Sequence, residues 1–525
     1  DWVNLCFHAY WSKFDGWAKN FVEASLKPMI HSELPSFLKD DVEIANFDLG
    51  KTPPTFGHMT GRSLSIHSAK ITFDFDWSSN LTLEISIQNK TLGEHLSLGL
   101  ESISIKGQIT IVFNVKERGP ILSGWGATVY FFDMPEIEMG YIGVANTAHL
   151  PGIRGIIRKA ITQQLSSRMV LPNAFTLTFG DEDENAGTSI DMASVTSPVG
   201  ALRVTLVKAE GITSEGVDFF KMIHLKESRY MTLTLGGHTW KSPSIDPDTH
   251  RALVIHDLRQ ALKIEVWDED RITSGDKIGQ AGPYSVFDAI ALSGKPMPVH
   301  PSGSLQLNTS WLRAIPKELG DPQTDGCIVC VKVSAIILPL DLGESAKLQA
   351  TLDAGKHSRK EETRVVKRSE SRLLSTFQEL KQMGVHPKDV DKLQSSNKEL
   401  LKKMGILTHL YIHAHADNFS SATLTLSVLV EKKGKFHAVG HTWKKKVSDV
   451  SKLPDCTMPG PIKLGSSIEV HADIELWGLF PDDKQANKFQ EDELEQSRKG
   501  ASKKVQKGAV KHTHVGLGLL GSRWA

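Results

Sequence analysis

Apolar and polar residues alternate strictly along the stretch from Ala69 to Phe132. Within 70–77, an aromatic or aliphatic residue follows each lysine, threonine or aspartate, and the same period of two returns in 81–87, 109–115 and 129–131. Successive side chains of a β-strand point to opposite faces, so each segment builds one apolar and one polar face. The pattern therefore predicts neighbouring strands that form a long apolar wall, of which residues 69–77 alone would extend roughly 30 Å.

Periodicity leaves two interpretations of this wall open. In the first, the sheet packs against the chain's own helices as a closed core, which is the common reason for such alternation. In the second, the wall lines a groove for lipid. One helix is predicted in 2–38, and another opens at Pro151-Gly152 and closes before Pro172.

The remaining chain changes character several times. An acidic linker rich in serine and glycine precedes short, regularly spaced strands that are typical of an all-β sandwich. Further strand-like runs bracket a helical insertion, and a charged tail with a final strand follows. The predicted fold class is multidomain, α+β at first and all-β afterwards. The predicted parts are 1–180, the linker 181–199, 200–316, 323–480 with the insertion 367–404, and the tail 481–525.

Composition fits a globular protein whose 525 residues are enough for about three or four domains. The formal net charge is zero, so no overall field attracts nucleic acid, and no such partner is expected. Four cysteines are too few for a disulfide framework and favour a reducing compartment. No apolar run approaches the length of a membrane span, and the chain begins at Asp1 inside a patterned segment. We therefore expect any membrane anchor to lie upstream of this chain.

Two residue patterns could suggest metal binding, but a structural role in a β-strand explains each of them better. Cys327 and Cys330 lie three apart in a predicted strand, where they face opposite sides and cannot share an ion, so two buried thiols are expected. A histidine group with an alternating spacing is more typical of a solvated strand face than of a zinc site. Its members are His409, His413 and His415, with His512 and His514 as a second pair. No nucleophile elbow, kinase signature or zinc-protease helix occurs, so no enzyme activity is expected.

Several segments of the first part together resemble the SMP domain of the extended synaptotagmin and tricalbin family. They are Trp2-Val3-Asn4 with Trp11, the run FDLGKTPP at 47–54, the strand ITFDFDW at 71–77, and 153–161 followed by Val170-Leu171-Pro172-Asn173. In that family a C2 domain comes next, and the run GALRVTL at 200–206 resembles the first C2 strand.

This resemblance implies a tubular lipid-binding domain, then a C2-type sandwich and a divergent C2-like part. It implies binding of phospholipid and its transfer between apposed membranes at contact sites of the endoplasmic reticulum. It also implies C2 docking to a membrane surface and a homodimer formed through the SMP domain. The alternative is a tether or scaffold that no longer carries lipid. The residues expected to line the lipid are Ile71, Phe73, Phe75, Trp77, Leu83, Ile85, Ile87, Ile109, Ile111, Phe113, Val129, Phe131, Ile157 and Ile161.

The resemblance also raises Ca²⁺ as a cofactor, because C2 domains bind it between aspartate-rich loops. Asp268, Asp270 and Asp276 occupy the ligand positions of the family's third loop. The first loop departs from the pattern, since Ser228 stands at the aspartate position and Arg229 adds an opposing charge. One of Glu215, Asp218 and Glu227 would have to substitute, with Asp218 as our candidate ligand. We expect weak or absent Ca²⁺ binding.

Overall fold

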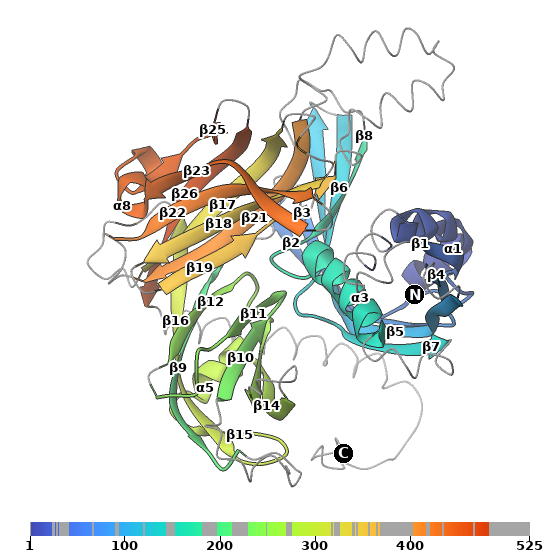
Figure 1. Cartoon of the computed structure of the whole chain (residues 1–525), viewed down its shortest axis with the longest axis horizontal. Coiled ribbons are helices and arrows are strands. Elements are labelled where there is room, and N and C mark those ends of the chain that lie inside the picture. The colour runs from blue at the N-terminus through green and yellow to red at the C-terminus, as the bar shows by residue number, and fades with distance from the viewer. Residues whose placement is uncertain are drawn as a thin grey trace, which may run out of the picture. The chain divides into compact units, whose positions relative to one another are not determined.

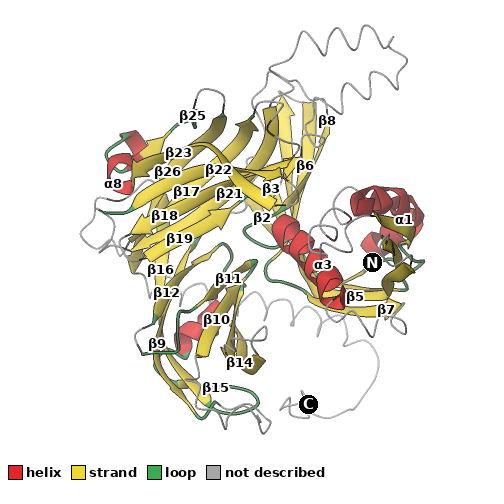
Figure 2. Cartoon of the chain, viewed as in Figure 1, coloured by secondary structure: helices red, strands yellow, loops and turns green. Residues whose placement is uncertain are grey.

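The computed structural model is built mainly from β-strands, with few helices (Figure 1 and Figure 2). No helix among the described residues is long and apolar enough to cross a membrane. The structure describes residues 2–23, 27, 30, 41–65, 68–89, 94–118, 121–142, 153–180, 197–212, 229–247, 249–268, 276–316, 319, 326–338, 342, 345–354, 357–363, 366–367, 403–415, 421–432, 435–465 and 468–481.

The first part is an eight-stranded antiparallel sheet, and the helices described in it are α1 and α3. The strand order is β1-β4-β5-β3-β2, while β6 and β7 also pair with β5, and β8 pairs with β6. The elements are α1 (Trp2–Phe21), β1 (Asp41–Asp48), β2 (Thr55–Ser65), β3 (Ser68–Ser79), β4 (Thr82–Asn89), β5 (Glu94–Arg118), β6 (Ile121–Phe131), β7 (Glu136–Ile142), α3 (Ile153–Met169) and β8 (Phe175–Gly180).

Strand β5 is central to this sheet because its 25 residues pair with four other strands. Its first half pairs with β4 and β7, and its second half pairs with β3 and β6. The strands predicted from alternation are confirmed, since all four alternating segments lie within β3 to β6. Of the helix predicted in 2–38, α1 covers Trp2–Phe21, and 31–40 lie outside the described residues.

The next part is a sandwich in which the sheet β11-β10-β13-β14 faces the strands β12-β9-β16. The short helix α5 begins at Ser285, whose side chain accepts a hydrogen bond from the Asp288 amide as an N-cap. The elements are β9 (Gly200–Glu210), β10 (Arg229–Leu235), β11 (His238–Lys241), β12 (His250–Ile255), β13 (Ala261–Asp268), β14 (Asp276–Ser285), α5 (Val286–Ala291), β15 (Pro296–Pro298) and β16 (Ser304–Pro316).

A second sandwich has the same build of two sheets. The sheet β19-β18-β22-β23 faces the strands β26-β17-β21. The elements are β17 (Gly326–Ile337), β18 (Ser345–Ala354), β19 (His357–Glu362), β20 (Val366–Lys367), β21 (Lys403–His415), β22 (Thr423–Lys432), β23 (Lys435–Lys446), α8 (Val447–Val450), η9 (Pro454–Cys456), β24 (Thr457–Met458), β25 (Ile462–Lys463) and β26 (Glu469–Pro481). Residues 368–402 of the predicted helical insertion, 181–196 of the linker and 482–525 of the tail lie outside the described residues.

The two sandwiches share one continuous sheet. The end of β16 pairs with the end of β26, so nine strands from both sandwiches belong to a single sheet. The buried residues Ala201, Leu312, Tyr411 and Leu479 pack together between the two halves. His413 is also buried, and Arg359 donates hydrogen bonds to it. The solvated face predicted for the β21 histidines is therefore wrong at His413, because this face packs between the sandwiches.

Candidate functional site

The apolar face of the first sheet is built by residues that lie opposite one another on three strands. Phe73 on β3 pairs with Ile109 on β5, which pairs with Phe131 on β6. Directly opposite residues point to the same face, so each such row adds to one apolar surface. The neighbouring row consists of Ile71, Ile111 and Val129.

Two clusters of packed side chains make up this surface. One surrounds Phe73 and Phe131, and the other surrounds Ile85 and Ile157 in the other half of the sheet. Met134 and Leu165 pack against both clusters, so the apolar surface is continuous. The predicted residues found in the clusters are Ile71, Phe73, Phe75, Trp77, Leu83, Ile85, Ile109, Ile111, Val129, Phe131, Ile157 and Ile161. Phe113 lies in neither cluster, and the side chain of Ile87 is outside the described residues.

Exposure along this surface is uneven. The buried members of the predicted set are Phe73, Leu83, Ile85, Ile109, Phe131 and Ile157. The half-buried members are Ile71, Phe75, Trp77, Ile111, Phe113, Val129 and Ile161. Residues that share one face of a close-packed core are expected to be buried alike. Part of this apolar face therefore keeps accessible surface.

Helix α1 packs against both clusters and is fixed there by polar contacts. The side chain of Asn4 accepts a hydrogen bond from the Phe56 amide (2.8 Å) and donates one to the Phe56 carbonyl (2.9 Å). The indole of Trp11 donates to the carbonyl of Gly50 (2.8 Å), and the carboxylate of Asp15 accepts from the amide of Leu49 (3.1 Å). The run FDLGKTPP at 47–54 therefore supplies the backbone groups that hold α1 in place.

Gly50 is required in that run by its backbone. Its φ is +81°, a region that favours glycine, and a Cβ there would lie 2.3 Å from the hydroxyl oxygen of Ser79. The same close approach lets Ser79 donate a hydrogen bond to the carbonyl of Leu49 (3.0 Å). The run FDLGKTPP, on which part of the family resemblance rests, is therefore a tight connection that fixes α1 against the sheet.

The outer side of α1 is unusually apolar. Trp2, Leu5 and Tyr10 are 69%, 71% and 64% exposed. Phe7 and Val3, on the inner side, pack against the cluster around Phe73.

Sequence reasoning missed one central member of the surface. Phe56 is buried in the cluster around Phe73, and its ring lies 4.7 Å from that of Phe7 and 5.5 Å from that of Phe73. It stands on β2, where glycines and polar residues hide any alternation. Periodicity therefore carried no signal for it.

The structure describes little of the predicted Ca²⁺ loops. Asp218 and Asp270 lie outside the described residues, as does the side chain of Asp276. Asp268 ends β13, where its register partners are Arg229 on β10 and Asp276 on β14. An arginine opposite a ligand position opposes cation binding. Among the described residues, no group of three His, Cys, Asp or Glu side chains is placed to hold a metal ion.

The prediction for Cys327 and Cys330 is confirmed. Both are fully buried on β17, Cys327 in the core of the second sandwich and Cys330 in the cluster between the sandwiches. Burial raises the pKa of the Cys327 thiol to about 12 and also raises that of Cys330. These thiols are neutral packing groups that face opposite sides of the strand.

Comparisons with known proteins agree with this geometry, although no family model matches the chain. Extended synaptotagmin-3 of Xenopus tropicalis is 23% identical over 331 residues, which cover 60% of this chain and 35% of that protein. Extended synaptotagmin-2 of Mus musculus is 22% identical over 373 residues, or 66% and 42% of the two chains. Synaptotagmin-3 of Arabidopsis thaliana is 22% identical over 293 residues, or 53% and 51%. The homologues of this chain are the extended synaptotagmins and the plant synaptotagmins.

A solved structure of the SMP domain and two C2 domains of extended synaptotagmin 2 has the same fold. The TM-score is 0.54 at 14% identity, and the match covers 92% of this chain and 99% of that one. We therefore call the parts of this synaptotagmin homologue the SMP-like part, the first sandwich and the second sandwich. The chain spans about a third to a half of the length of these curated relatives.

Two phenylalanines on β3 test whether the apolar face is open. Phe73→Ala should cost about 3–5 kcal/mol of unfolding free energy, as is usual for a buried phenylalanine. Phe75→Ala, on the same strand and face, should cost clearly less because Phe75 is only half-buried. Denaturant titration of delipidated protein measures both values. Equal costs would show a closed core and contradict the open face.

Proposed function

We propose that this chain binds a glycerophospholipid on the apolar face of its SMP-like part and transfers it between apposed membranes. The observation that carries this proposal is the continuous apolar face formed by two clusters, with half-buried residues along it. The proposed mechanism is passive, because the acyl chains contact the face while the head group stays near water. No bond is made or broken, so the protein acts as a carrier and not as an enzyme.

A physical requirement supports this proposal. Exposing an acyl chain to water costs roughly 0.8 kcal/mol for each CH₂ group, which sums to tens of kcal/mol for two chains. A carrier must therefore offer apolar surface along the length of the tails. The rows on β3, β5 and β6 and the cluster around Ile85 supply such a surface, and α3 contributes Ile157 and Ile161 to it.

The relatives of this chain support a cellular setting for the proposal. The homologues are extended and plant synaptotagmins, and by analogy we propose a role in lipid transport and membrane tethering at contact sites of the endoplasmic reticulum. The sandwiches would then attach the protein to a membrane.

A scaffold that no longer carries lipid is the second candidate. It is favoured by the tight packing of the cluster around Ile85, where Ile85 and Ala160 are completely buried. Such a protein would bridge membranes without a bound lipid.

Native mass spectrometry of the whole chain distinguishes the two. The carrier should co-purify with phospholipid, and Ile111→Asp should lower the bound fraction about tenfold or more because a carboxylate would face the acyl chains. Ser104→Asp, on the opposite face of β5, should retain the lipid. Transfer of labelled phospholipid between vesicles should follow the same order. Vesicle bridging without bound lipid or transfer would establish the scaffold instead.

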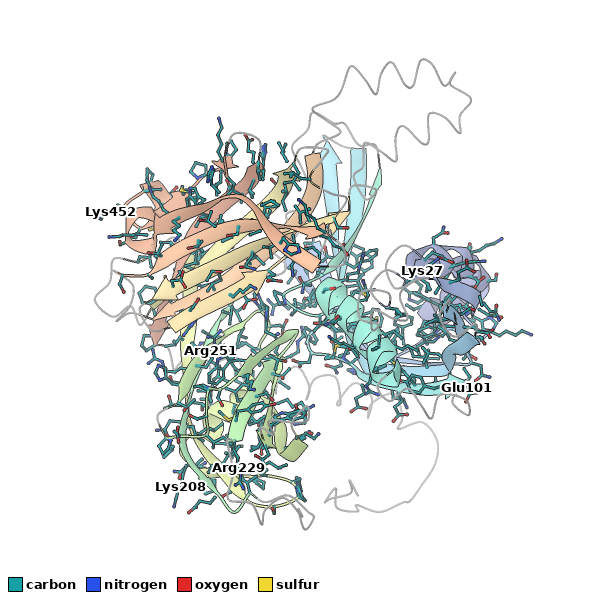
Figure 3. The ribbon with its side chains drawn as sticks, in the orientation of Figure 1. Lys27, Glu101, Lys208, Arg229, Arg251 and Lys452 are labelled. Carbon is teal, nitrogen blue, oxygen red and sulfur yellow. The ribbon has the colours of Figure 1, made fainter. Side chains whose placement is uncertain are left out.

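Lysines on the second sandwich support membrane attachment. Lys444 and Lys446 are exposed on β23, the edge strand of its sheet, and the exposed Lys452 follows α8 (Figure 3). Each lysine close to an anionic leaflet contributes about 1 kcal/mol. We propose that this basic edge binds anionic lipid without Ca²⁺, and that Ca²⁺ binding by the first sandwich is weak or absent because Arg229 faces Asp268.

Flotation of the chain with anionic vesicles tests both statements. Lys444→Glu with Lys446→Glu should weaken binding roughly tenfold or more. Binding of the unaltered chain should be nearly the same in chelator and in about 1 mM Ca²⁺, and calorimetry with Ca²⁺ should show little heat. A large Ca²⁺-dependent gain that Asp268→Asn abolishes would contradict this account.

The exposed apolar side of α1 supports the homodimer. Trp2, Leu5 and Tyr10 are large side chains of the kind that protein interfaces bury, and we propose that a second copy covers them. Leu5→Asp should raise the dimer dissociation constant roughly tenfold or more, whereas Thr60→Asp on the exposed surface of β2 should not. Sedimentation of both variants measures this effect, and a monomeric unaltered chain would refute the dimer.

A further inference from the structure

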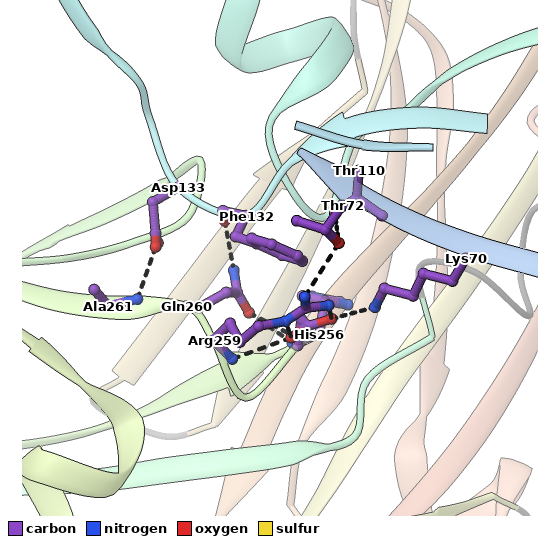
Figure 4. A network of polar contacts seen from close by, with 10 residues as sticks. Lys70, Thr72, Thr110, Phe132, Asp133, His256, Arg259, Gln260 and Ala261 are labelled. Carbon is purple, nitrogen blue, oxygen red and sulfur yellow. Dashed lines mark hydrogen bonds and ion pairs between the residues drawn. The ribbon is translucent and has the colours of Figure 1, made fainter. Parts of the chain in front are cut away.

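The polar side of the alternating strand β3 is covered by the first sandwich. Lys70 and Thr72 point away from the apolar face, toward the connection between β12 and β13 (Figure 4). The β10–β11 turn contacts the same surface, because the amide of Gly237 donates to the carbonyl of Leu171 (2.8 Å). Two loops of the sandwich therefore meet one surface of the SMP-like part.

A charged group forms the centre of this contact. Asp257 of the sandwich is bound by Lys70 of the SMP-like part at 2.5 Å and by Arg259 at 3.1 Å. Arg259 also donates to the hydroxyl of Thr72 (3.1 Å), and Thr72 shares a hydrogen bond with Thr110 (2.9 Å). Burial alone would raise the pKa of Asp257, but the two cations outweigh it and hold the pKa at about 2. The carboxylate is thus ionised and paired, and only 13% of its side chain is exposed.

A carboxylate on the SMP-like part holds the sandwich backbone. One oxygen of Asp133 accepts from the amide of Gly236 (3.0 Å), and the other accepts from the amide of Ala261 (2.8 Å) (Figure 4). The side chain of Gln260, which is 1% exposed, donates to the carbonyl of Phe132 (3.3 Å). Both sandwich loops are therefore fixed by the same segment that follows β6.

Apolar and aromatic groups exclude water around these contacts. Tyr130, Phe132 and Leu171 are buried together, and the guanidinium of Arg259 lies 4.0 Å from the ring centre of Phe132. Gly236 has a φ of +59°, and a Cβ there would lie 2.6 Å from the carbonyl oxygen of Leu171. The turn can approach this closely only with glycine.

The directions of the strands show which end of the first sandwich contacts the SMP-like part. Strand β13 begins at Ala261, in the contact, and ends at Asp268. Eight residues of strand separate these two ends by about 23 Å. Strand β10 runs the other way, from Arg229 opposite Asp268 to Leu235 beside the docked turn. Asp268 and Arg229 are therefore at the end of the sandwich opposite to the contact.

We propose that Lys70, Asp257, Arg259 and Asp133 form a permanent joint that makes the SMP-like part and the first sandwich one rigid body, with the Asp268 end of that sandwich directed away from the joint. The first sandwich is then a fixed arm. Because it shares one sheet with the second sandwich, membrane attachment at the basic edge of the second sandwich sets the orientation of the lipid-carrying sheet. That consequence rests on the proposed function, whereas the joint itself does not.

Distances between spin labels on the whole chain test the joint. Labels at His58→Cys on β2 and Lys208→Cys on β9, both exposed, would be placed in a chain carrying Cys6→Ser and Cys456→Ser. The account predicts one narrow distance distribution. Lys70→Glu puts a carboxylate against the largely covered Asp257 and should broaden the distribution several-fold, while Lys70→Met should broaden it less. Asp74→Asn, exposed on the same strand and outside the contact, should change nothing.

A second variant, in the first sandwich, controls for the possibility that Lys70→Glu simply misfolds. Asp257→Asn keeps an oxygen for the amide of Arg259 but removes the charge, so it should broaden the distances while the circular dichroism of the chain stays the same. A broad distribution in the unaltered chain, or a narrow one in Lys70→Glu, would overturn the joint. Native mass spectrometry of the same samples reports bound lipid separately. A narrow distribution without lipid would refute the proposed function and leave the joint standing.

Discussion

The strict period of two along β3 and β5 is the constraint on which the rest of this protein depends. It gives one sheet two chemically different faces, and each face has its own partner. On one face, Phe73, Ile109 and Phe131 begin a continuous apolar surface. On the other, Lys70 and Thr72 meet the charged loop of the first sandwich. A slip of one residue would exchange the faces and destroy both contacts at once.

The energetic roles of the faces differ. The apolar face gains stability from area removed from water, and its half-buried members leave some of that gain for a ligand. The polar face contributes specificity, because a buried charge that loses its partner is far more costly than an apolar group that loses a contact. Asp257 is therefore suited to enforce one arrangement of two parts, and the shared sheet between the sandwiches extends that order further along the chain.

Much of this architecture could be predicted from local pattern. Alternation located β3 to β6, and the spacing of Cys327 and Cys330 placed them on opposite sides of β17. Contacts between segments that are distant in the sequence could not be predicted. Nothing local marks Phe56 as a core residue, Lys70 as the partner of a residue 187 positions away, or His413 as buried between sandwiches. Those properties belong to the packing of parts, which no single strand encodes.

The central claim is that the apolar face of the SMP-like part contacts acyl chains. A crystal structure of the whole chain with a phospholipid brominated along its tails tests it most directly, because bromine is located by its anomalous scattering. The account predicts bromine within about 4–4.5 Å of Ile111, Phe75 or Val129. Side chains that fill this space completely, with bromine absent or bound elsewhere, would contradict the account.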